Sequence, residues 1–262
     1  MILIIIVLVV AVVALATVAT AHHKRSRPRL IQTVRDRRAD HSFCQRMIDQ
    51  SGDPSVVREI YDNDDIRRFL ARHFSSNVQK AFSHINPAYG ACVSDFARYC
   101  LVYIRGGAYL DIKSRVNRPL QPLFDRGGGD ALVVTHWPGG YRPHADTLAM
   151  ERGEICNWVF LCTARHPVLR LVIDAAVDNI LSGRYRGATG KEAVLAMTGP
   201  ILFSRVIRRA MFEDRYKGSI VITDELHSYF TYNTMDCSGN CRSAYYGSTP
   251  SYDGRSDAVL LM

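Results

Sequence analysis

The pattern of hydrophobic and polar positions divides the chain into short apolar runs, which predict strands, and longer segments with helical periodicity. Predicted strands cover residues 29–32, 59–61, 108–110, 131–134, 155–160 and 220–222, the last of them buried. Predicted helices cover residues 42–50, 66–74, 78–84, a segment ending at 105, 167–181, 191–197 and 201–212. Because strands and helices alternate, the pattern predicts an α/β fold with a mostly parallel sheet flanked by helices.

Two long segments lack such periodicity. Residues 137–154 are rich in Gly, Pro and His, a composition typical of a long surface loop that covers a substrate. The tail, residues 229–262, is rich in Tyr, Ser, Gly and Asp and is predicted to wrap back over the domain. His136, Trp137 and His144 in the loop are interpreted as local structure. For His227, Tyr252 and Arg255, closure over a ligand and simple packing both remain open.

The first 21 residues form an apolar run without a charged side chain, close to the length that spans a bilayer. The run predicts a single-pass membrane anchor that contacts lipid through residues 2–21. A cleaved signal peptide is the alternative, because Ala19-Thr20-Ala21 has the small residues of a cleavage site. Residues 22–28 then form a basic linker, and residues 29–262 form one domain. The basic residues after the run leave open whether this domain faces a Golgi- or ER-type lumen or the cytoplasm.

Charge and cysteine content narrow the picture further. The formal net charge is +8, but Lys and Arg are interleaved with Asp and Glu, so nucleic acid is not indicated as a partner. Of seven cysteines, Cys100, Cys156 and Cys162 lie in apolar segments and are predicted to be buried thiols. Cys237 and Cys241 are close enough in sequence to form a disulfide, which the spacing neither requires nor excludes.

Candidate chemistry concentrates in residues 94–120. Asp95 and Arg98 are three residues apart, so on a helix they share one face. Gly106-Gly107 is predicted to end that helix, and a short strand then places Asp111 at its carboxyl end, where α/β sheets bind ligands. The simpler alternatives are a surface ion pair for Asp95 and Arg98 and a turn-forming acid for Asp111.

This stretch resembles the glycosyltransferases with a sugar-binding region that contains an Asp-x-Asp motif, the group related to initiation-specific α-mannosyltransferases and capsular sugar transferases. The matching positions are Ser94, Asp95, Arg98, Tyr99, Tyr103, Gly106, Gly107, Tyr109, Leu110, Asp111, Pro119 and Leu120. The resemblance implies a GT-A-like, Rossmann-like domain that transfers a hexose, with retention of configuration, from a nucleoside-diphosphate sugar to a glycan or lipid-linked acceptor.

The resemblance also implies roles for individual residues. Asp95 and Arg98 would bind the hydroxyls of the donor sugar, and Asp111 would contact the ribose, the sugar or a metal ion. Other substrate-binding candidates are Tyr109, Lys113, Asn157, Thr198 and Gly199. Of these, Asn157 has the alternative of satisfying local backbone groups, and Thr198-Gly199-Pro200 has the alternative of a helix end followed by a helix start.

The sequence departs from the family pattern at two places. Lys113 replaces the second acid of Asp-x-Asp, and on an extended segment it would lie on the same side as Asp111. The hypothesis is that its ammonium takes over part or all of the charge of Mn²⁺ or Mg²⁺. The alternative is that Lys113 faces solvent while Asp111 and Asp253 hold the metal.

The second departure is in the first strand, where the aromatic residue that would stack on the donor base is missing around Gln32-Thr33. The choice of donor therefore stays open. The loss of the second acid also keeps a second function in view, a catalytically inactive, membrane-anchored module that binds sugar nucleotides or glycans.

Overall fold

A six-stranded sheet forms the centre of the structure, a computed structural model that describes residues 27–38, 56–126, 131–137, 153–232 and 254–261. In spatial order the strands are β2 (Val57–Tyr61), β1 (Arg29–Thr33), β3 (Gly107–Leu110), β6 (Val159–Cys162), β5 (Leu132–Val134) and β7 (Ile220–Ile222). All neighbouring pairs are parallel except those of β6, which runs antiparallel to β3 and β5. The predicted mostly parallel α/β sheet is confirmed.

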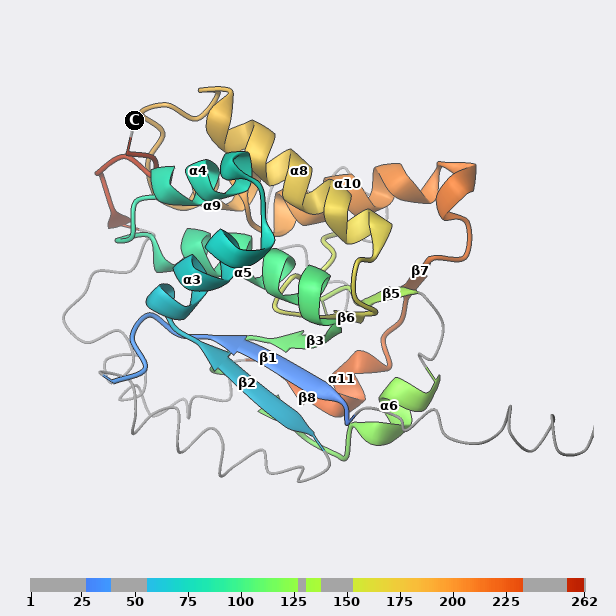
Figure 1. The fold of residues 1–262 in the computed structure, drawn as a ribbon. Helices are drawn as coiled ribbons and strands as arrows, with labels where there is room; N and C mark the ends of the chain where they lie inside the picture. The colour runs from blue at the N-terminus through green and yellow to red at the C-terminus, as the bar shows by residue number, and fades with distance from the viewer. Residues whose placement is uncertain (1–26, 39–55, 127–130, 138–152, 233–253, 262) are drawn as a thin grey trace, which may run out of the picture.

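Helices and a small second sheet cover the two faces of the large sheet (Figure 1). On one side lie α3 (Asn63–His73), α4 (Ser76–His84), α5 (Gly90–Arg105), α8 (Pro167–Leu181), α9 (Gly190–Met197) and α10 (Pro200–Met211). On the other lie α6 (Gln121–Arg126), α11 (Leu226–Tyr229) and the antiparallel pair β4 (Arg115–Val116) and β8 (Phe230–Thr231). A short 3-10 helix, η2 (Asp214–Tyr216), joins α10 to β7. Two apolar cores result, one on each face of the sheet.

The predicted end of α5 is confirmed. Gly106 and Gly107 have φ angles of 63° and 102°, a region that favours glycine, and the Gly106 N–H donates to Val102 O at 2.8 Å. A Cβ on Gly107 would lie 2.6 Å from Arg29 O. The two glycines thus reverse the chain tightly enough for β3 to pair with β1.

Two predicted strands differ from the structure. Strand β6 begins at Val159, because Ile155 is drawn out of the ladder by a bridge to His136 and by an N–H···O bond to Ser204 Oγ of 2.8 Å. Strand β7 was expected to be buried, but it is the outermost strand of the sheet and Val221 is 42% exposed. The predicted helix 42–50 and most of the predicted loop 137–154 lie outside the described residues.

The end of the tail packs on α4 and α5, as predicted. Asn86 N–H donates to Val259 O at 2.8 Å, and Leu261 N–H donates to His84 O at 2.7 Å. Arg255 pairs with Asp257 at 3.0 Å, which favours the packing role over the ligand-binding one. In Figure 1 the C-terminus accordingly lies beside α4 and α9.

The predictions for the N-terminal segment and for the cysteines lie partly outside the described residues. In the described ranges no helix is both long and apolar enough to cross a bilayer; residues 1–21, where an anchor is predicted, lie outside those ranges. The division into residues 1–21, 22–28 and 29–262 therefore stays a prediction. Cys237 and Cys241 are also outside the described residues, whereas Cys100, Cys156 and Cys162 are buried free thiols, as predicted.

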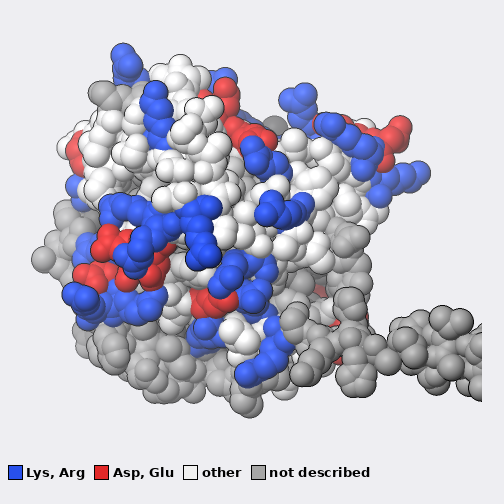
Figure 2. Space-filling model, viewed as in Figure 1, with Lys and Arg blue, Asp and Glu red and all other residues white. Residues whose placement is uncertain are grey.

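Charged side chains on the surface are mixed in sign. Figure 2 shows acidic side chains set among the basic ones on the face that carries α3 and β2. Several are paired, including Arg67 with Asp64 and Arg68 with Asp65, both at 2.7 Å. This interleaving agrees with the expectation from the sequence.

Candidate functional site

A buried guanidinium lies at the centre of the candidate site. Arg98 of α5 is 4% exposed, and its Nη2 lies 3.0 Å from Asp95 Oδ1 and 3.1 Å from Asp111 Oδ1. Its Nη1 donates to Asn157 O at 2.7 Å, and its Nε donates to Ser94 O at 3.3 Å. The helix therefore brings Asp95 and Arg98 together as predicted, but as a buried pair, and the surface ion pair is wrong.

Asp111 follows β3 at the carboxyl edge of the sheet. Its backbone N–H donates to Trp158 O at 2.9 Å, and its Oδ1 accepts from Tyr109 Oη at 3.0 Å. The guanidinium of Arg98 stacks on the Tyr109 ring, with Cζ 4.5 Å from the centroid. With a side chain 17% exposed, Asp111 is the most accessible member of the carboxylate–guanidinium group formed by Asp95, Arg98 and Asp111.

Asn157 completes this group from the turn before β6. Its Nδ2 donates to Asp95 Oδ1 and to Tyr99 Oη, both at 3.0 Å. Tyr99 in turn donates to Thr198 O at 2.9 Å, so Thr198, which is fully buried, supports the site from below. Asn157 therefore contacts the group with its side chain, and Thr198 is linked to it through Tyr99. The substrate-binding roles predicted for both residues stay predictions.

Three hydroxyl groups form a further layer, and of their residues the sequence analysis did not propose Thr33 as part of the site. Thr33 Oγ1 lies 2.6 Å from Ser94 Oγ and 3.0 Å from Tyr109 Oη, and Ser94 Oγ lies 3.1 Å from Tyr109 Oη. Ser94 and Tyr109 are among the positions that match the family pattern, whereas Thr33 lies in the first strand, where the sequence departs from it. These bonds connect β1, α5 and β3 directly beneath Asp111.

Burial controls the electrostatics of the group. It raises the pKa of Asp95 to about 7; Arg98 and the amide of Asn157 oppose this rise, and Asp111 and Glu154 add to it. Burial works against the charge of Arg98, but Asp111, Tyr109 and Asp95 outweigh it and raise the pKa of Arg98. The site therefore holds a permanent cation between two acids.

Lys113 does not follow Asp111 on an extended segment. Residues 111–114 form a turn in which Ser114 N–H donates to Asp111 O at 2.9 Å, so the prediction that both side chains point to one side of a strand is wrong. Lys113 is half-buried, with its Nζ 5.4 Å from the centroid of the Tyr232 ring. Its ammonium therefore lies against an aromatic ring beside the site.

The described residues fit a divalent cation poorly. Such a cation needs several oxygen ligands, and Asp111 Oδ1 already accepts hydrogen bonds from Arg98 and Tyr109. Position 113, where the family has its second acid, carries an ammonium. Across the described ranges no group of three or more His, Cys, Asp or Glu side chains is arranged to hold a metal. The other predicted ligand, Asp253, lies outside them.

Close packing against Leu195 explains why position 199 is a glycine. It lies between α9 and α10, and a Cβ there would come within 2.8 Å of Leu195 Cα and 3.1 Å of Leu195 O. We expect Gly199→Ala to lower the free energy of unfolding by ~1–3 kcal/mol, because the backbone must move apart. Gly90→Ala is the matched control, since nothing lies within 4 Å of a Cβ at that helix start. Equal urea midpoints for the two variants would contradict the steric argument.

Glu154 is a buried acid that the sequence analysis did not single out. It is 1% exposed, and its Oε1 accepts from Trp137 Nε1 at 2.6 Å. Burial raises the pKa of Glu154 to about 7, although the Trp137 hydrogen bond and the charge of Lys191 act in the opposite direction. Glu154 is close enough to Asp95 to raise the pKa of that carboxyl as well.

The raised pKa predicts a pH effect on stability. The folded chain keeps the Glu154 proton up to about pH 7, whereas the unfolded chain loses it near 4.5, so stability is lost as pH rises through this window. Relative to Glu154→Gln, the wild type should lose ~3 kcal/mol of unfolding free energy between about pH 4 and pH 8. Urea titrations of both proteins across this range measure the difference; a constant difference would refute the shift.

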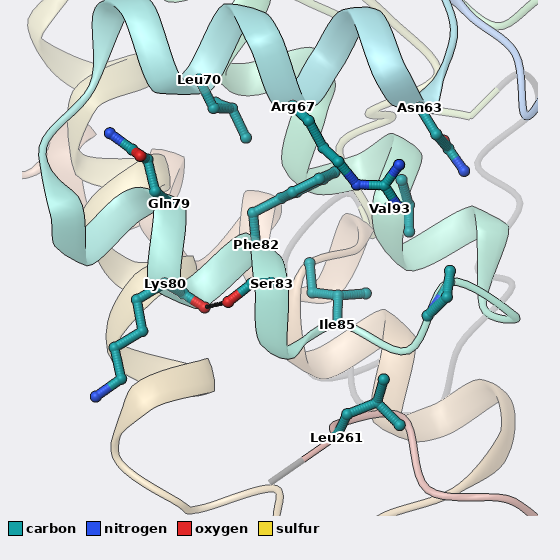
Figure 3. Close-up of a pocket in the computed structure, with 11 residues that line it drawn as sticks. Asn63, Arg67, Leu70, Gln79, Lys80, Phe82, Ser83, Ile85, Val93 and Leu261 are labelled. Carbon is teal, nitrogen blue, oxygen red and sulfur yellow. Dashed lines mark hydrogen bonds between the residues drawn. The ribbon is translucent and has the colours of Figure 1, made fainter.

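A separate hollow of about 630 Å³ lies on the outer side of the helices (Figure 3). It opens between α3, α4 and the last residues of the described chain, with Leu70, Phe82 and Leu261 among its lining. Three of its polar groups are engaged locally: Gln79 Nε2 donates to Phe74 O at 2.8 Å, Arg67 Nη1 to Asp64 Oδ1 at 2.7 Å, and Ser83 Oγ to Lys80 O at 2.8 Å. None of its lining residues belongs to the carboxylate–guanidinium group.

The site coincides with a known family segment. Residues 29–128 match the model of the glycosyltransferase sugar-binding region containing a DXD motif, and this range includes Asp95, Arg98 and Asp111. Residues 29–128 are thus similar to the sugar-binding region of the DXD glycosyltransferases. At the position of the motif this chain reads Asp111-Ile112-Lys113.

Two curated proteins are similar to this chain. The initiation-specific alpha-1,6-mannosyltransferase of Candida albicans is 26% identical over 128 residues, which are 44% of this chain and 33% of that protein. An uncharacterized glycosyltransferase of Acanthamoeba polyphaga mimivirus is 26% identical over 192 residues, 73% of this chain and 67% of the relative. The chain thus spans about a third of the length of the mannosyltransferase.

Solved structures of glycosyltransferase domains are also similar. The ligand-free glycosyltransferase domain of the YGT toxin shares 12% identity at a TM-score of 0.44, over 74% of this chain and 56% of that one. The PaToxG glycosyltransferase shares 15% identity at a TM-score of 0.41, over 69% and 68% of the two chains.

Proposed function

We propose that this DXD glycosyltransferase region is a GT-A-like enzyme that transfers a hexose, with retention, from a nucleoside-diphosphate sugar to a glycan or lipid-linked acceptor. The observation that carries the proposal is the buried carboxylate–guanidinium group at the carboxyl edge of the sheet, within the family segment. The names of the relatives, a mannosyltransferase and a glycosyltransferase, support the same reaction class. Membrane attachment through residues 2–21 is part of this proposal.

In this proposal the three charged residues have different roles. Asp111 is the accessible acid and binds a donor hydroxyl as a charge-assisted acceptor. All three nitrogens of Arg98 contact protein groups, so Arg98 orients Asp111 rather than reaching the donor itself. Asp95 and Asn157 hold Arg98 from behind. The roles first assigned to Asp95 and Arg98 thereby become positioning roles.

Retention follows in this scheme from front-face displacement, in which the acceptor hydroxyl attacks C1 of the sugar on the side of the departing diphosphate. The bond from C1 to the diphosphate oxygen breaks, and that oxygen takes up the proton of the hydroxyl. Departure of a nucleoside diphosphate builds up negative charge, which a cation must stabilise. Lys113, two residues after Asp111 and part-buried against Tyr232, is the cation that the described chain offers beside the site. In related enzymes a divalent metal supplies this charge when bound.

A donor panel tests the proposal. Purified protein is incubated with UDP- and GDP-hexoses, with and without Mn²⁺, and the release of nucleoside diphosphate and the anomeric configuration of the product are measured. We expect turnover of one donor and a product of retained configuration. Measurable donor binding without any turnover would instead establish the second function, an inactive sugar-nucleotide-binding module, which the replacement of the second acid by Lys113 favours.

Lys113 gives a sharper prediction. In the presence of a chelator we expect residual transfer, and Lys113→Ala should lower it by about tenfold, equivalent to ~1.4 kcal/mol, because the diphosphate loses its cation. Lys217→Ala is the control, since Lys217 is an exposed lysine after α10. If a chelator abolishes transfer while Lys113→Ala leaves the metal-supported rate unchanged, the role of Lys113 is wrong.

A further inference from the structure

Three aromatic rings form a cluster next to Asp111, here called the aromatic cluster: Trp137, Trp158 and Tyr232. The ring centroids of Trp158 and Tyr232 are 5.0 Å apart, those of Trp137 and Tyr232 are 5.1 Å apart in an edge-to-face arrangement, and those of the two tryptophans are 6.3 Å apart. The rings come from three separate parts of the chain, following β5, preceding β6 and following β8. The fold therefore gathers them at one place.

The aromatic cluster is attached to the site through the backbone. Trp158 O accepts the Asp111 N–H at 2.9 Å, and Lys113 Nζ lies 5.4 Å from the Tyr232 centroid. Asn157 and Trp158 are neighbours in the chain, yet Asn157 bonds to Asp95 on the α5 side while Trp158 packs in the core on the opposite face. The carboxylate–guanidinium group and the aromatic cluster thus flank the same edge of the sheet.

The rings are held in fixed positions. Trp137 donates to Glu154 Oε1 at 2.6 Å, and His227, whose ring is 6.3 Å from that of Trp158, has its Nε2 2.7 Å from His136 O. Trp158 is 3% exposed and forms the base, whereas Trp137 and Tyr232 are partly exposed. Partly exposed rings next to charged groups are the composition of a site that binds the apolar face of a sugar ring and orients its hydroxyls.

The strand order indicates whether the aromatic cluster binds the sugar of the donor or that of the acceptor. In open α/β sheets the nucleotide binds where the strand order reverses, which here is between β1 and β3, beside Thr33 and Asp111. The aromatic cluster lies on the other side of Asp111, where β6 and β5 follow. A donor that extends from the reversal point to Asp111 therefore has the aromatic cluster beside its sugar and diphosphate, because Lys113, the cation proposed for the diphosphate, lies against Tyr232. Front-face displacement requires the acceptor to approach on this side.

We infer that the aromatic cluster is the subsite for the acceptor, with Trp137 stacking on the apolar face of a hexopyranose and Tyr232, which is perpendicular to it, bordering the same sugar. This inference rests on the proposed function, because it assigns the second substrate of the same reaction. It also assigns a role to Trp137, which the sequence analysis interpreted as local structure.

The test separates acceptor from donor. With the donor found active, transfer to a panel of methyl hexopyranosides is measured together with hydrolysis of the donor in water, for the wild type and for Trp137→Ala, Trp137→Phe and Tyr232→Ala. We expect each alanine variant to raise the acceptor KM by about tenfold and Trp137→Phe to restore most of the loss. Donor KM and donor hydrolysis should be unchanged in Trp137→Ala, whereas Tyr232→Ala also removes the ring that Lys113 contacts. Phe212→Ala is the control, because Phe212 is an aromatic residue 91% exposed after α10.

Two other outcomes overturn the inference, and a third is decided by a separate measurement. For Trp137→Ala, a rise in donor KM, or an equal loss of hydrolysis and transfer, would assign the ring to the nucleoside or to folding. Unchanged acceptor KM in the alanine variants would remove the subsite while leaving the proposed function intact. Absence of turnover in the wild type is a failure of the proposed function itself, and saturation-transfer NMR with the same methyl hexopyranosides then decides the subsite: signal lost in Trp137→Ala supports it, and no signal in the wild type refutes it.

Discussion

Replacing Arg98 with methionine should lower the free energy of unfolding by ~3–5 kcal/mol, because two buried carboxylates would lose their shared cation. Asp95 and Asp111 both lie within 3.1 Å of Arg98 Nη2, and the side chain of Arg98 is only 5% exposed. Urea denaturation of the purified protein measures the change. The loss should be smaller at acid pH, since Asp95, with its pKa raised to about 7, takes up a proton most readily.

Two further variants isolate the cause. Arg105→Met on the same helix removes the cation that pairs with Glu59, and the Arg105 side chain is 42% exposed. This variant should therefore lower the free energy of unfolding by no more than ~1 kcal/mol. Adding Asp95→Asn to Arg98→Met should recover part of the loss, because one of the two uncompensated acids is removed. A loss for Arg98→Met as small as that for Arg105→Met would mean that the buried pair does not stabilise the fold.

The second large effect is expected on activity. Asp111→Asn should lower kcat/KM for the active donor by ~10²-fold or more, because the accessible acceptor of the site loses its charge while its shape is kept. Stability should change much less than in Arg98→Met, since the Asp111 side chain is 17% exposed and an amide oxygen still accepts from Tyr109. Initial-rate kinetics alongside urea denaturation report the two effects separately.

The matched control for this variant is Asp174→Asn. Asp174 pairs with Arg170 at 2.9 Å on the surface of α8, with half of its side chain exposed. It should leave both the rate and the stability unchanged. If Asp111→Asn retained the wild-type rate, Asp111 would not be a donor-binding group, and the assignment of the active edge would have to be revised.

How far the sequence predicts this site depends on the range of the contacts. Asp95 and Arg98 were placed together because helical spacing is local, and Asp111 was placed at the edge because glycine ends α5 and a strand follows. The depth to which Asp95 and Arg98 are buried was not predictable. It depends on Asn157, which is far away in sequence, and on the hydroxyl of Tyr99, which faces inward. Side-chain periodicity shows which residues share one face of a helix, but it does not show which other parts of the chain pack over that face.

The errors have equally physical causes. The turn at residues 111–114 depends on one backbone hydrogen bond, from Ser114 to Asp111, that an alternation of side chains does not reveal. Strand β7 is as apolar as a buried strand, yet its place at the end of the sheet order exposes Val221. The aromatic cluster was missed because its three rings are joined only through tertiary structure.

The reversed strand β6 has a consequence for how the family segment can be handled. The match ends at residue 128, but β6, at Val159–Cys162, is the strand that pairs with β3 in the middle of the sheet. A fragment cut at the end of the match would contain Asp95, Arg98 and Asp111, yet leave Ala108–Leu110 as an open, apolar sheet edge, which is a template for aggregation. Expression of the sugar-binding segment alone should therefore yield insoluble protein, and the smallest unit worth producing extends past β6.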